Sequence, residues 1–323
     1  MPVMNPSAIS HQPINSLFTE EACPLCGGKD AQVLRAATYP PGASLAMLQS
    51  AYSASSDSSL LDQVVECRGC RMVYISPRLD AQLIQSGYEN VEDPVFVAQN
   101  PQRIKTFSRS VERLLKQTGL DPQGKRLLDV GCAGGAFPAA ARQFGFEVAG
   151  VEPSQWLSAY ARREYGLDVR QGILQAGMFP EHSFDVISLW DVIEHVPDPH
   201  AVFTLVRSLL KPDGYLWVNY PDIGSIAARL MGWKWPFWLS VHLHYYRRPT
   251  IAQQIGRGGF TVSFMQPHWQ QLQFGYVMQR AKVIAPVLAP LETMVRWSGL
   301  GGLPFTYNMG QTMVVAKVTQ TGA

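Results

Sequence analysis

An apolar strand, a glycine-rich turn and a helix start follow one another over Leu127–Phe137, which reads LLDVGCAGGAF. The glycines of the turn, Gly131, Gly134 and Gly135, let the backbone bend tightly and approach a ligand closely. The helix that begins there offers free backbone N–H groups to a carboxylate. Glu152 ends the next apolar strand, where an acidic side chain can accept hydrogen bonds from both hydroxyls of a ribose. The spacing predicts a nucleoside-binding site.

Asp129, at the end of the first strand, decides which nucleoside cofactor fits. A dinucleotide requires the pattern G-x-G-x-x-G, and here the three positions hold Gly131, Ala133 and Ala136. A carboxylate beside a pyrophosphate would be repulsive, whereas beside the ammonium group of a methionine moiety it would be attractive. The residues therefore favour S-adenosylmethionine over a dinucleotide.

Histidine side chains could supply a second piece of chemistry, a base that works near neutral pH. His195 closes the run DVIEH, which follows the fourth expected strand, and open α/β sheets bind ligands at that carboxyl edge. His242 and His244 lie in the run HLHYY, where alternation can put both on one face of an extended stretch. We expect His195 and His244 to be the catalytic residues. Two alternatives stay open: the Glu-His pair only hydrogen-bonds nearby loops, or HLHYY is a packed loop.

Four of the five cysteines form two Cys-x-x-Cys pairs: Cys23, Cys26, Cys67 and Cys70. In a chain without an export signal, such pairs favour thiolates on a metal over disulfides. Four thiolates make a closed tetrahedral zinc site, so the ion would be structural. The segment between the pairs is longer than usual, but its Ser-rich stretch at 53–59 explains a long loop at modest entropic cost. Free thiols or a redox pair are the alternatives.

Strands and helices alternate over 121–222, which predicts βαβ units and a parallel sheet that positions these residues. The expected strands are Arg126–Val130, Glu147–Val151, Asp168–Gln171, Phe184–Leu189, Tyr215–Asn219, Phe260–Met265 and Thr312–Val318. The expected helices are Gly135–Phe144, Ser154–Tyr165 with Ser154 as N-cap, Pro199–Leu210 and a segment near 249–257. Apolar residues at helical spacing also make 81–120 mostly helical, with Gly119 as a stop.

Four segments resemble the successive motifs of the class I S-adenosylmethionine-dependent methyltransferases: Leu127–Phe137, Val148–Ser154, Phe184–Pro199 and Leu209–Asn219. One bacterial branch of that family carries an N-terminal zinc-binding segment, which extends the resemblance to residues 21–80. The resemblance implies a Rossmann-like, mostly parallel seven-stranded sheet with an N-terminal zinc ribbon. In some members the histidine that matches His195 acts as a base. Ala133 departs from the family pattern, since many members have glycine there, and we expect cofactor binding to survive the added methyl group.

The resemblance also implies what surrounds the cofactor. The glycine loop packs on its methionine part, and the residue matching Glu152 binds the ribose. The loop after the third strand, which contains Gly172 and Ile173, lies near the adenine. Trp190 and Asp191, after the fourth strand, lie near the methionine side.

The chain divides into a flexible tail at 1–20, a zinc-ribbon segment at 21–80, a helical linker at 81–120, and a methyltransferase domain at 121–323 with insertions at 223–248 and 267–310. A net charge of +2 without a run of Lys or Arg gives little support for a nucleic-acid partner. The sequence contains neither a continuous apolar span of transmembrane length nor a secretory signal, so we expect a cytoplasmic protein.

Taken together, the residues predict methyl transfer from S-adenosylmethionine to the oxygen or carbon of a small molecule. By resemblance, the acceptor is a sugar or polysaccharide-linked metabolite, or a quinone-like lipid. The alternatives are an RNA methyltransferase with a zinc ribbon and a non-catalytic module that binds zinc and S-adenosylmethionine. The aromatic segment 232–246 is a substrate lid, ordinary core or a peripheral membrane contact, and the oligomeric state is not indicated.

Overall fold

The structure is a computed structural model of the chain, and it describes residues 17–41, 44, 47, 60–80, 83–84, 88–89, 91–284, 287 and 289–319. Most of the expected tail at 1–20 and the Ser-rich stretch at 53–59 lie outside the described residues.

A seven-stranded sheet forms the centre of the fold, with the strand order β12-β15-β10-β9-β6-β7-β8. The neighbouring strands from β10 to β8 are parallel, and β15 runs antiparallel to both β10 and β12. The expected Rossmann-like, mostly parallel sheet is therefore confirmed. Its strands are β6 (Arg126–Val130), β7 (Glu147–Glu152), β8 (Asp168–Gln171), β9 (Phe184–Trp190), β10 (Leu210–Pro221), β12 (Phe260–Pro267) and β15 (Gln311–Val318).

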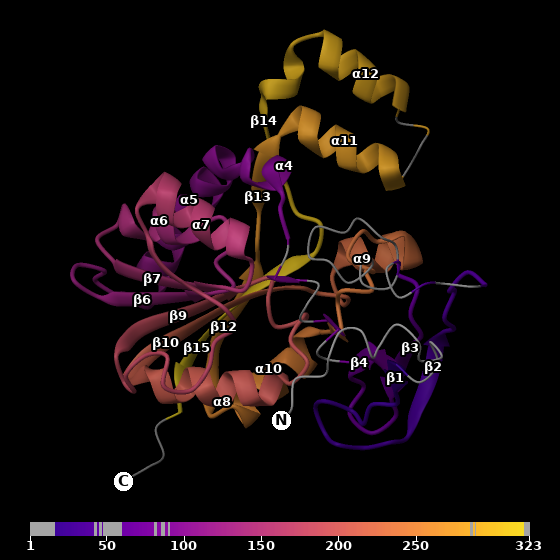
Figure 1. Cartoon of the computed structure of the whole chain (residues 1–323), viewed down its shortest axis with the longest axis horizontal. Coiled ribbons are helices and arrows are strands. Elements are labelled where there is room, and N and C mark those ends of the chain that lie inside the picture. The colour runs from indigo at the N-terminus through magenta and orange to yellow at the C-terminus, as the bar shows by residue number, and fades with distance from the viewer. Residues whose placement is uncertain are drawn as a thin grey trace.

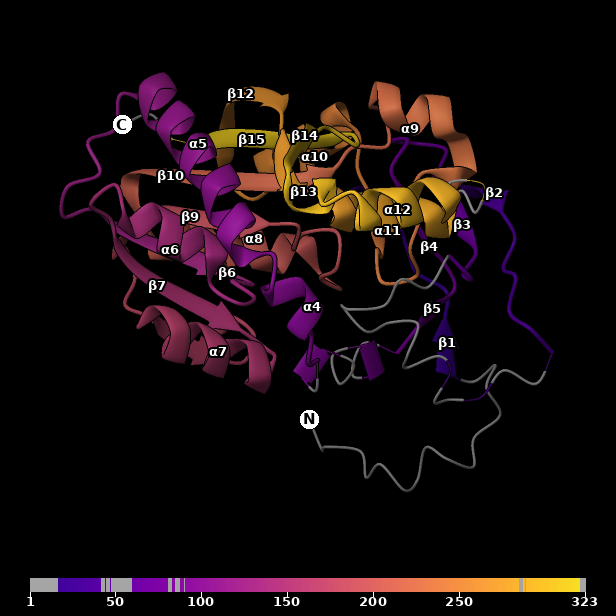
Figure 2. The same cartoon turned by 90° about the horizontal axis from the view of Figure 1, so that it is seen from above.

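Helices cover both faces of this sheet, as Figures 1 and 2 show, with α5, α6 and α7 on one face and α8 and α10 on the other. Their bounds are α5 (Asn100–Thr118), α6 (Ala136–Arg142), α7 (Gln155–Tyr165), α8 (Pro199–Leu209) and α10 (Arg248–Arg257). Local sequence sets their ends: the Ser154 hydroxyl accepts a hydrogen bond from the Leu157 amide at the start of α7, and Gly119 ends α5 at a left-handed φ of 68°. Both signals were expected.

The core lies on both faces of the central strands. Phe203 and Val206 of α8, with Ile251 and Ile255 of α10, pack on one face, while Val111 of α5 and neighbouring α6 residues pack on the other. All seven residues of β9 are buried, as expected for a strand with parallel neighbours and helices on both sides. The sheet is thus a rigid support for the loops at its carboxyl edge.

β10 differs most from the expectation, whereas β7, β9, β12 and β15 differ by only one or two residues at one end. Regular pairing of β10 with β9 does run from Tyr215 to Asn219, but β10 spans Leu210–Pro221 because Leu210 also pairs with Phe184 across a register shift. The turn-forming residues 211–214 are therefore an irregularity inside a strand rather than a loop before it.

A second, four-stranded sheet with the order β11-β4-β3-β2 carries the cysteine pairs. Three of its strands come from the N-terminal segment: β2 (Ala31–Arg35), β3 (Val64–Cys67) and β4 (Val73–Ile75). The fourth, β11 (His244–Tyr245), comes from the segment expected as an insertion at 223–248. A short pair, β1 (Phe18–Thr19) with β5 (Arg78–Leu79), lies beside it.

The segment 267–310 forms a small unit that projects away from the central sheet (Figure 1). Its base is the antiparallel pair of β13 (Gln270–Gln273) and β14 (Pro304–Tyr307). Between these strands come α11 (Phe274–Ile284), α12 (Ala289–Trp297) and the 3-10 turn η4 (Leu300–Gly302). The short elements elsewhere are α4 (Pro94–Val97), α9 (Ile226–Met231) and the 3-10 turn η2 (Gly232–Lys234). Within the described part of the chain, no helix is long and apolar enough to cross a membrane.

Candidate active site

The glycine-rich turn joins β6 to α6 at the carboxyl edge of the central sheet. Gly131 and Gly135 have positive φ angles of 71° and 80°, which L side chains rarely adopt. Close packing adds a second constraint, since a Cβ on Gly131 would lie 2.6 Å from a methyl carbon of Val192. Gly135 is the N-cap of α6, and no side chain caps that helix. The first turn of α6 thus keeps amide groups for a ligand.

Glu152, the last residue of β7, is buried and faces this turn. Its two carboxylate oxygens accept hydrogen bonds from the Ala133 and Ser154 amides, each at 2.8 Å. Burial raises the pKa of Glu152 to about 7, although the two amide bonds act in the opposite direction. The bonds to both amides fix the carboxylate across the mouth of the turn, with lone pairs left over for further donors.

Asp129, on the neighbouring strand β6, is the second buried carboxylate of this pocket. The Ser188 hydroxyl donates to one of its oxygens at 2.6 Å. Burial raises the pKa of Asp129 to about 8, and the nearby charge of Glu152 contributes to the rise. Two carboxylates in one buried pocket favour a cationic ligand between them.

Trp190 is the last residue of β9, and Asp191 follows it. Asp191 has a φ of 55°, and one carboxylate oxygen accepts hydrogen bonds from the side-chain amides of Asn219 at 2.7 Å and Gln311 at 2.8 Å. The Trp190 ring packs on Phe107, Phe137 and His268, and its indole N–H has no hydrogen-bond partner among the described residues.

The loop after β8 carries Gly172 and Ile173. The Gly172 amide donates to the Glu152 carbonyl at 2.9 Å, and its φ of 124° requires glycine. Ile173 leaves 41% of its side chain exposed, so an apolar surface stands beside the end of β7. That surface suits the flat face of an adenine ring.

The segment that leads into α5, together with the first residue of that helix, contacts the glycine-rich turn and the start of α7. The sequence patterns did not predict these contacts. The Asn100 side-chain amide donates to the Gly134 carbonyl at 3.0 Å, and the Ser154 hydroxyl donates to the Val91 carbonyl at 2.7 Å. Val97 of α4 packs with Leu157 in one apolar cluster. The sequence Asp93-Pro94 could have predicted the start of a helix here. In the structure the Asp93 carboxylate caps α4.

This pocket fits S-adenosylmethionine, whose polar groups are a ribose diol, an ammonium, a carboxylate and a sulfonium. Glu152 can accept from the diol, Asp129 can pair with positive charge, and the uncapped turn of α6 can receive the carboxylate. Gly131 keeps the turn close to Val192, because a Cβ there would collide with the Val192 side chain.

A second group of titratable side chains lies at the same sheet edge, after β9. Glu194 is 1% exposed and His242 is 4% exposed. The rings of His195 and His242 lie 4.7 Å apart between centroids. His195 Nδ1 lies 3.1 Å from the Val241 carbonyl oxygen and 2.9 Å from the Tyr88 hydroxyl. Burial lowers the pKa of His195 to about 4, so this imidazole is neutral at pH 7.

His244, the other histidine expected to be catalytic, occupies β11 and pairs with Tyr74 of the cysteine-bearing sheet. Its ring neighbours Tyr246 at 6.1 Å, while the ring that packs on His195 belongs to His242. The structure therefore brings His195 and His242 together, and it adds Tyr88. The sequence drew attention to His242 through the alternation in VHLHYY. No sequence pattern around Tyr88 predicted a place for that residue in the site.

The aromatic segment 232–246 is mostly packed against the protein. Trp235 is 1% exposed, and its indole N–H donates to the Met309 carbonyl at 2.6 Å. Tyr245 and Tyr246 are also buried, while Trp233 stays 44% exposed. The sequence left a substrate lid, ordinary core and a membrane contact open for this segment. Most of its described rings belong to the ordinary core.

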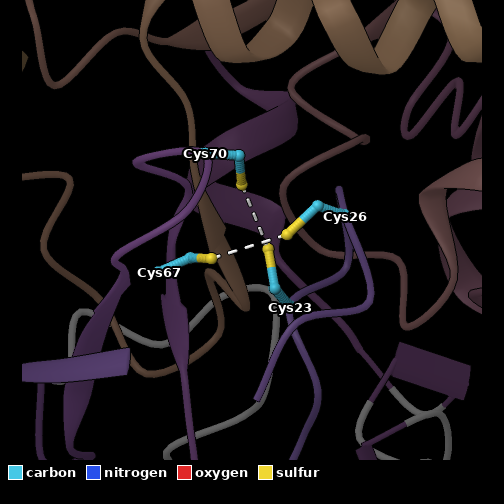
Figure 3. Close-up of side chains that lie close together, drawn as sticks. All are labelled: Cys23, Cys26, Cys67 and Cys70. Atoms are coloured by element: carbon cyan, nitrogen blue, oxygen red, sulfur yellow. Dashed lines mark hydrogen bonds between the residues drawn. The ribbon is translucent and has the colours of Figure 1, made fainter. Parts of the chain in front are cut away.

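The four paired cysteines converge on one point (Figure 3), where their side chains point toward one another. The Sγ atoms of Cys23 and Cys70 lie 3.4 Å apart and those of Cys26 and Cys67 3.5 Å apart, and all four lie within 4.8 Å of one another. These distances exclude disulfide bonds, which need about 2 Å between sulfurs. A closed set of four thiolates is consistent with a structural zinc ion and leaves no ligand position for catalysis.

Comparison with known proteins fits this geometry. A family model described as a methyltransferase domain matches residues 99–263, just over half of the chain. The chain is 35% identical over 106 residues to the ubiquinone biosynthesis O-methyltransferase of Xanthomonas axonopodis pv. citri, which covers 31% of this chain and 44% of that protein. The enzyme of the same name from Actinobacillus pleuropneumoniae serotype 5b is 36% identical over 106 residues, covering 30% of this chain and 45% of that protein. The chain thus spans less than half the length of these two relatives.

A solved structure supports the fold alone. A chain from the Haloferax volcanii complex of the Trm112 methyltransferase activator with a proposed methyltransferase superposes with a TM-score of 0.50 and 13% identity, over 71% of this chain and 96% of that chain. The match of the family model across the glycine turn and Glu152 is the stronger finding. The chain therefore belongs to the methyltransferase-domain family.

Proposed function

We propose that the chain transfers a methyl group from S-adenosylmethionine to a hydroxyl group of a quinone-like small molecule. The observation that carries this proposal is the junction of two groups at one sheet edge: the cofactor pocket around Glu152 and the Glu194–His195 pair. Tyr88 connects them, since its hydroxyl contacts His195 Nδ1, and burial, together with the nearby charges of Glu194 and Glu152, raises its pKa. The names of the curated relatives support the acceptor class.

S-adenosylmethionine supplies an activated methyl group on a positively charged sulfur. The carbon–sulfur bond breaks as the bond from carbon to the acceptor oxygen forms, and the sulfur leaves as a neutral thioether. The protein has to align the acceptor oxygen with the methyl group and exclude water. In this proposal Glu152, Asp129 and the glycine turn hold the methyl donor, while Gly172, Ile173, Trp190 and Asp191 line it.

The acceptor hydroxyl must also lose a proton. Nδ1 of His195 points at the Val241 carbonyl and therefore carries the ring proton, which leaves the Nε2 lone pair available. In the simplest form of the mechanism, Nε2 of His195 takes the proton from the acceptor. His244 would then keep the loop in place from β11 rather than touch the acceptor.

An apolar acceptor also needs a route to this edge. A cavity of about 560 Å³ lies between α4, α11, α12 and η4, lined among others by Val95, Gln99 and Tyr276. Gln99 precedes Asn100, which bonds the glycine turn. We propose that the head group reaches the methyl donor past this cavity and that an apolar tail stays against α11 and α12.

The test is methyl transfer from labelled S-adenosylmethionine to three acceptors: a short-tailed catechol, a nucleotide sugar and bulk RNA. We expect label on an oxygen of the catechol, loss of transfer in Glu152→Ala, and retention in Glu147→Ala, which changes an exposed carboxylate on the same strand. Label only on the sugar or the RNA would replace the proposed acceptor. Cofactor binding without transfer to any of the three would favour a non-catalytic module.

A further inference from the structure

Glu194 is a buried carboxylate without the contacts that burial requires. It is 1% exposed, and neither of its oxygens has a hydrogen-bond partner from another described residue. Burying an uncompensated carboxylate is strongly unfavourable, and native structures rarely leave one unsatisfied. Its backbone is tightly held, since the Leu243 and His244 amides both donate to the Glu194 carbonyl, at 2.8 and 3.1 Å. These two backbone hydrogen bonds therefore fix the position of residue 194 in the buried interior.

Two imidazoles lie close to the same carboxylate, and a backbone carbonyl lies near the Nδ1 atom of each. Nδ1 of His242 lies 2.8 Å from the Phe237 carbonyl oxygen, and Nδ1 of His195 lies 3.1 Å from the Val241 carbonyl oxygen. Each Nδ1 therefore donates to a backbone carbonyl, so each Nε2 carries a lone pair. Nε2 of His195 lies 3.9 Å from a Glu194 oxygen. A backbone carbonyl on Nδ1 is the usual support that orients a metal-binding histidine.

The spacing of the three groups suits one ion. A ligand atom from each of Glu194, His195 and His242 lies within 4.8 Å of the other two. Two atoms that bind one ion at about 2.0–2.2 Å lie at most about 4.4 Å apart, so a small inward shift completes the set. A cation here would neutralise Glu194 and occupy both lone pairs.

We propose that Glu194, His195 and His242 form a second cation site, distinct from the four cysteines, for a divalent first-row transition metal ion. Two imidazole nitrogens and one carboxylate favour such an ion over Ca²⁺ or Mg²⁺, which prefer oxygen ligands. Three protein ligands leave coordination positions open, unlike the closed cysteine site. The site therefore has room for a ligand from outside the chain.

The role of this ion deepens the proposed function and rests on it, although the binding itself does not. A hydroxyl next to a divalent cation loses its proton more easily. The proton then passes to solvent, and the acceptor oxygen attacks the methyl group while the carbon–sulfur bond breaks. His195 acts as a ligand in this scheme, which replaces its role as a free base.

The experiment uses the full-length chain with its cysteine site loaded with zinc, and Co²⁺ as the probe. We expect one added equivalent of Co²⁺ per chain, with absorption bands of nitrogen and oxygen ligation and without thiolate charge-transfer bands, while the zinc content stays constant. Glu194→Gln and His242→Ala should each weaken Co²⁺ binding by at least about tenfold, the usual effect of losing a ligand or its support. His200→Ala, which changes an exposed histidine on α8, is the matched control and should bind as the wild type does.

Binding of S-adenosylhomocysteine to the same samples shows that the variants are folded and separates the two proposals. Wild-type protein that binds S-adenosylhomocysteine but takes up no Co²⁺, or takes it up only by displacing zinc from the thiolates, overturns the second site and leaves the proposed function standing. Co²⁺ uptake that survives both Glu194→Gln and His242→Ala also overturns it. If the protein binds Co²⁺ as expected but does not bind S-adenosylhomocysteine, the cation site is supported and the proposed function is wrong.

Discussion

Ala133 holds a backbone conformation that suits glycine better. Its φ is 46°, and a left-handed alanine costs roughly 1 kcal/mol. Its amide nevertheless donates to Glu152 at 2.8 Å, so the conformation serves the carboxylate that the sequence assigns to ribose binding. The sequence flagged Ala133 only as a departure from a resembling pattern, because one sequence does not reveal φ.

Ala133→Gly should raise the free energy of unfolding by up to about 1 kcal/mol, since relief of strain exceeds the entropy that glycine adds to the unfolded chain. Urea unfolding measures this change. Ala159→Gly, within helix α7, is the control and should lower the same quantity by about 1 kcal/mol. A loss of stability in Ala133→Gly would show that position 133 is not strained.

Glu152 should make cofactor binding depend on pH. With a pKa near 7 in the ligand-free protein, the carboxylate is mostly protonated at pH 6 and mostly ionised at pH 8. Ribose hydroxyls donate to the ionised form, so the affinity for S-adenosylhomocysteine should rise about tenfold over this range, with release of a proton. Calorimetric titrations in buffers of different ionisation enthalpy measure both quantities.

The control for this pH dependence is Glu147→Gln, which should keep it, while Glu152→Gln should reduce it and leave only the contribution of Asp129, whose pKa of about 8 lies at the upper end of the range. An affinity for S-adenosylhomocysteine that is flat from pH 6 to 8 in the wild type would mean that Glu152 does not contact the ligand.

Residues of the site differ in how far the sequence predicts them. The positions of Asp129 and Glu152 follow from the sequence, because both lie at strand ends next to the glycine turn, and their contact with the cofactor stays a prediction. Tyr88 and His242 reach His195 from distant segments, and no spacing within one sequence brings 88, 195 and 242 together.

At the scale of elements, β11 links the two sheets of the protein. It pairs with β4 of the cysteine-bearing sheet, and the amides of Leu243 and His244 hold the Glu194 loop. Arg247 adds a bond to the Glu66 carboxylate in β3 at 3.0 Å. A structural ion at the four cysteines therefore supports the loop that carries Glu194 and His195.

Loss of the metal from the cysteine site should loosen this loop before it loosens the central sheet. In Cys67→Ser treated with a chelator, we expect hydrogen exchange of the amides in 241–246 to accelerate by about an order of magnitude or more, because metal binding contributes folding free energy locally. Exchange in β8, on the far edge of the central sheet, should stay unchanged. Equal hydrogen exchange in 241–246 with and without metal would show that the metal at the cysteines does not stabilise the loop.

Regular elements were the easiest to predict. The bounds of β6 and β8 match the expectation, and β6 in particular is a short apolar run between turn residues. The two-residue strand β11 and the unit from β13 to β14 escaped it, since strands this short depend on partners far away in the chain. The sheet around the cysteines likewise combines strands of the N-terminal segment with β11, which comes from the insertion at 223–248.

At the scale of the whole molecule, exposed apolar residues lie on several elements, among them α9, with Ile226 and Leu230, and the projecting helix α12. On α12, Leu291, Met294 and Trp297 are 40%, 60% and 81% exposed at helical spacing, next to the cavity proposed for the acceptor. Such a stripe can lie in the interface of a bilayer that holds an apolar acceptor.

We predict that the wild-type protein floats with liposomes and that Met294→Ser combined with Trp297→Ser reduces the bound fraction several-fold. Each exposed apolar side chain contributes roughly 1 kcal/mol or more on burial. Trp269→Ser is the control, because Trp269 is 53% exposed but lies at the turn between β12 and β13. Equal flotation of the double variant and the wild type would show that α12 does not contact the membrane.

Calorimetric titration of the purified chain with S-adenosylhomocysteine at pH 8 tests the account most directly, because every proposed step needs the pocket between the glycine turn and Glu152. We predict one molecule bound per chain, an affinity at least about tenfold weaker in Glu152→Ala, equivalent to about 1.4 kcal/mol, and no change in Glu147→Ala. A folded wild-type chain that gives neither binding heat nor a shift in melting temperature would contradict the account.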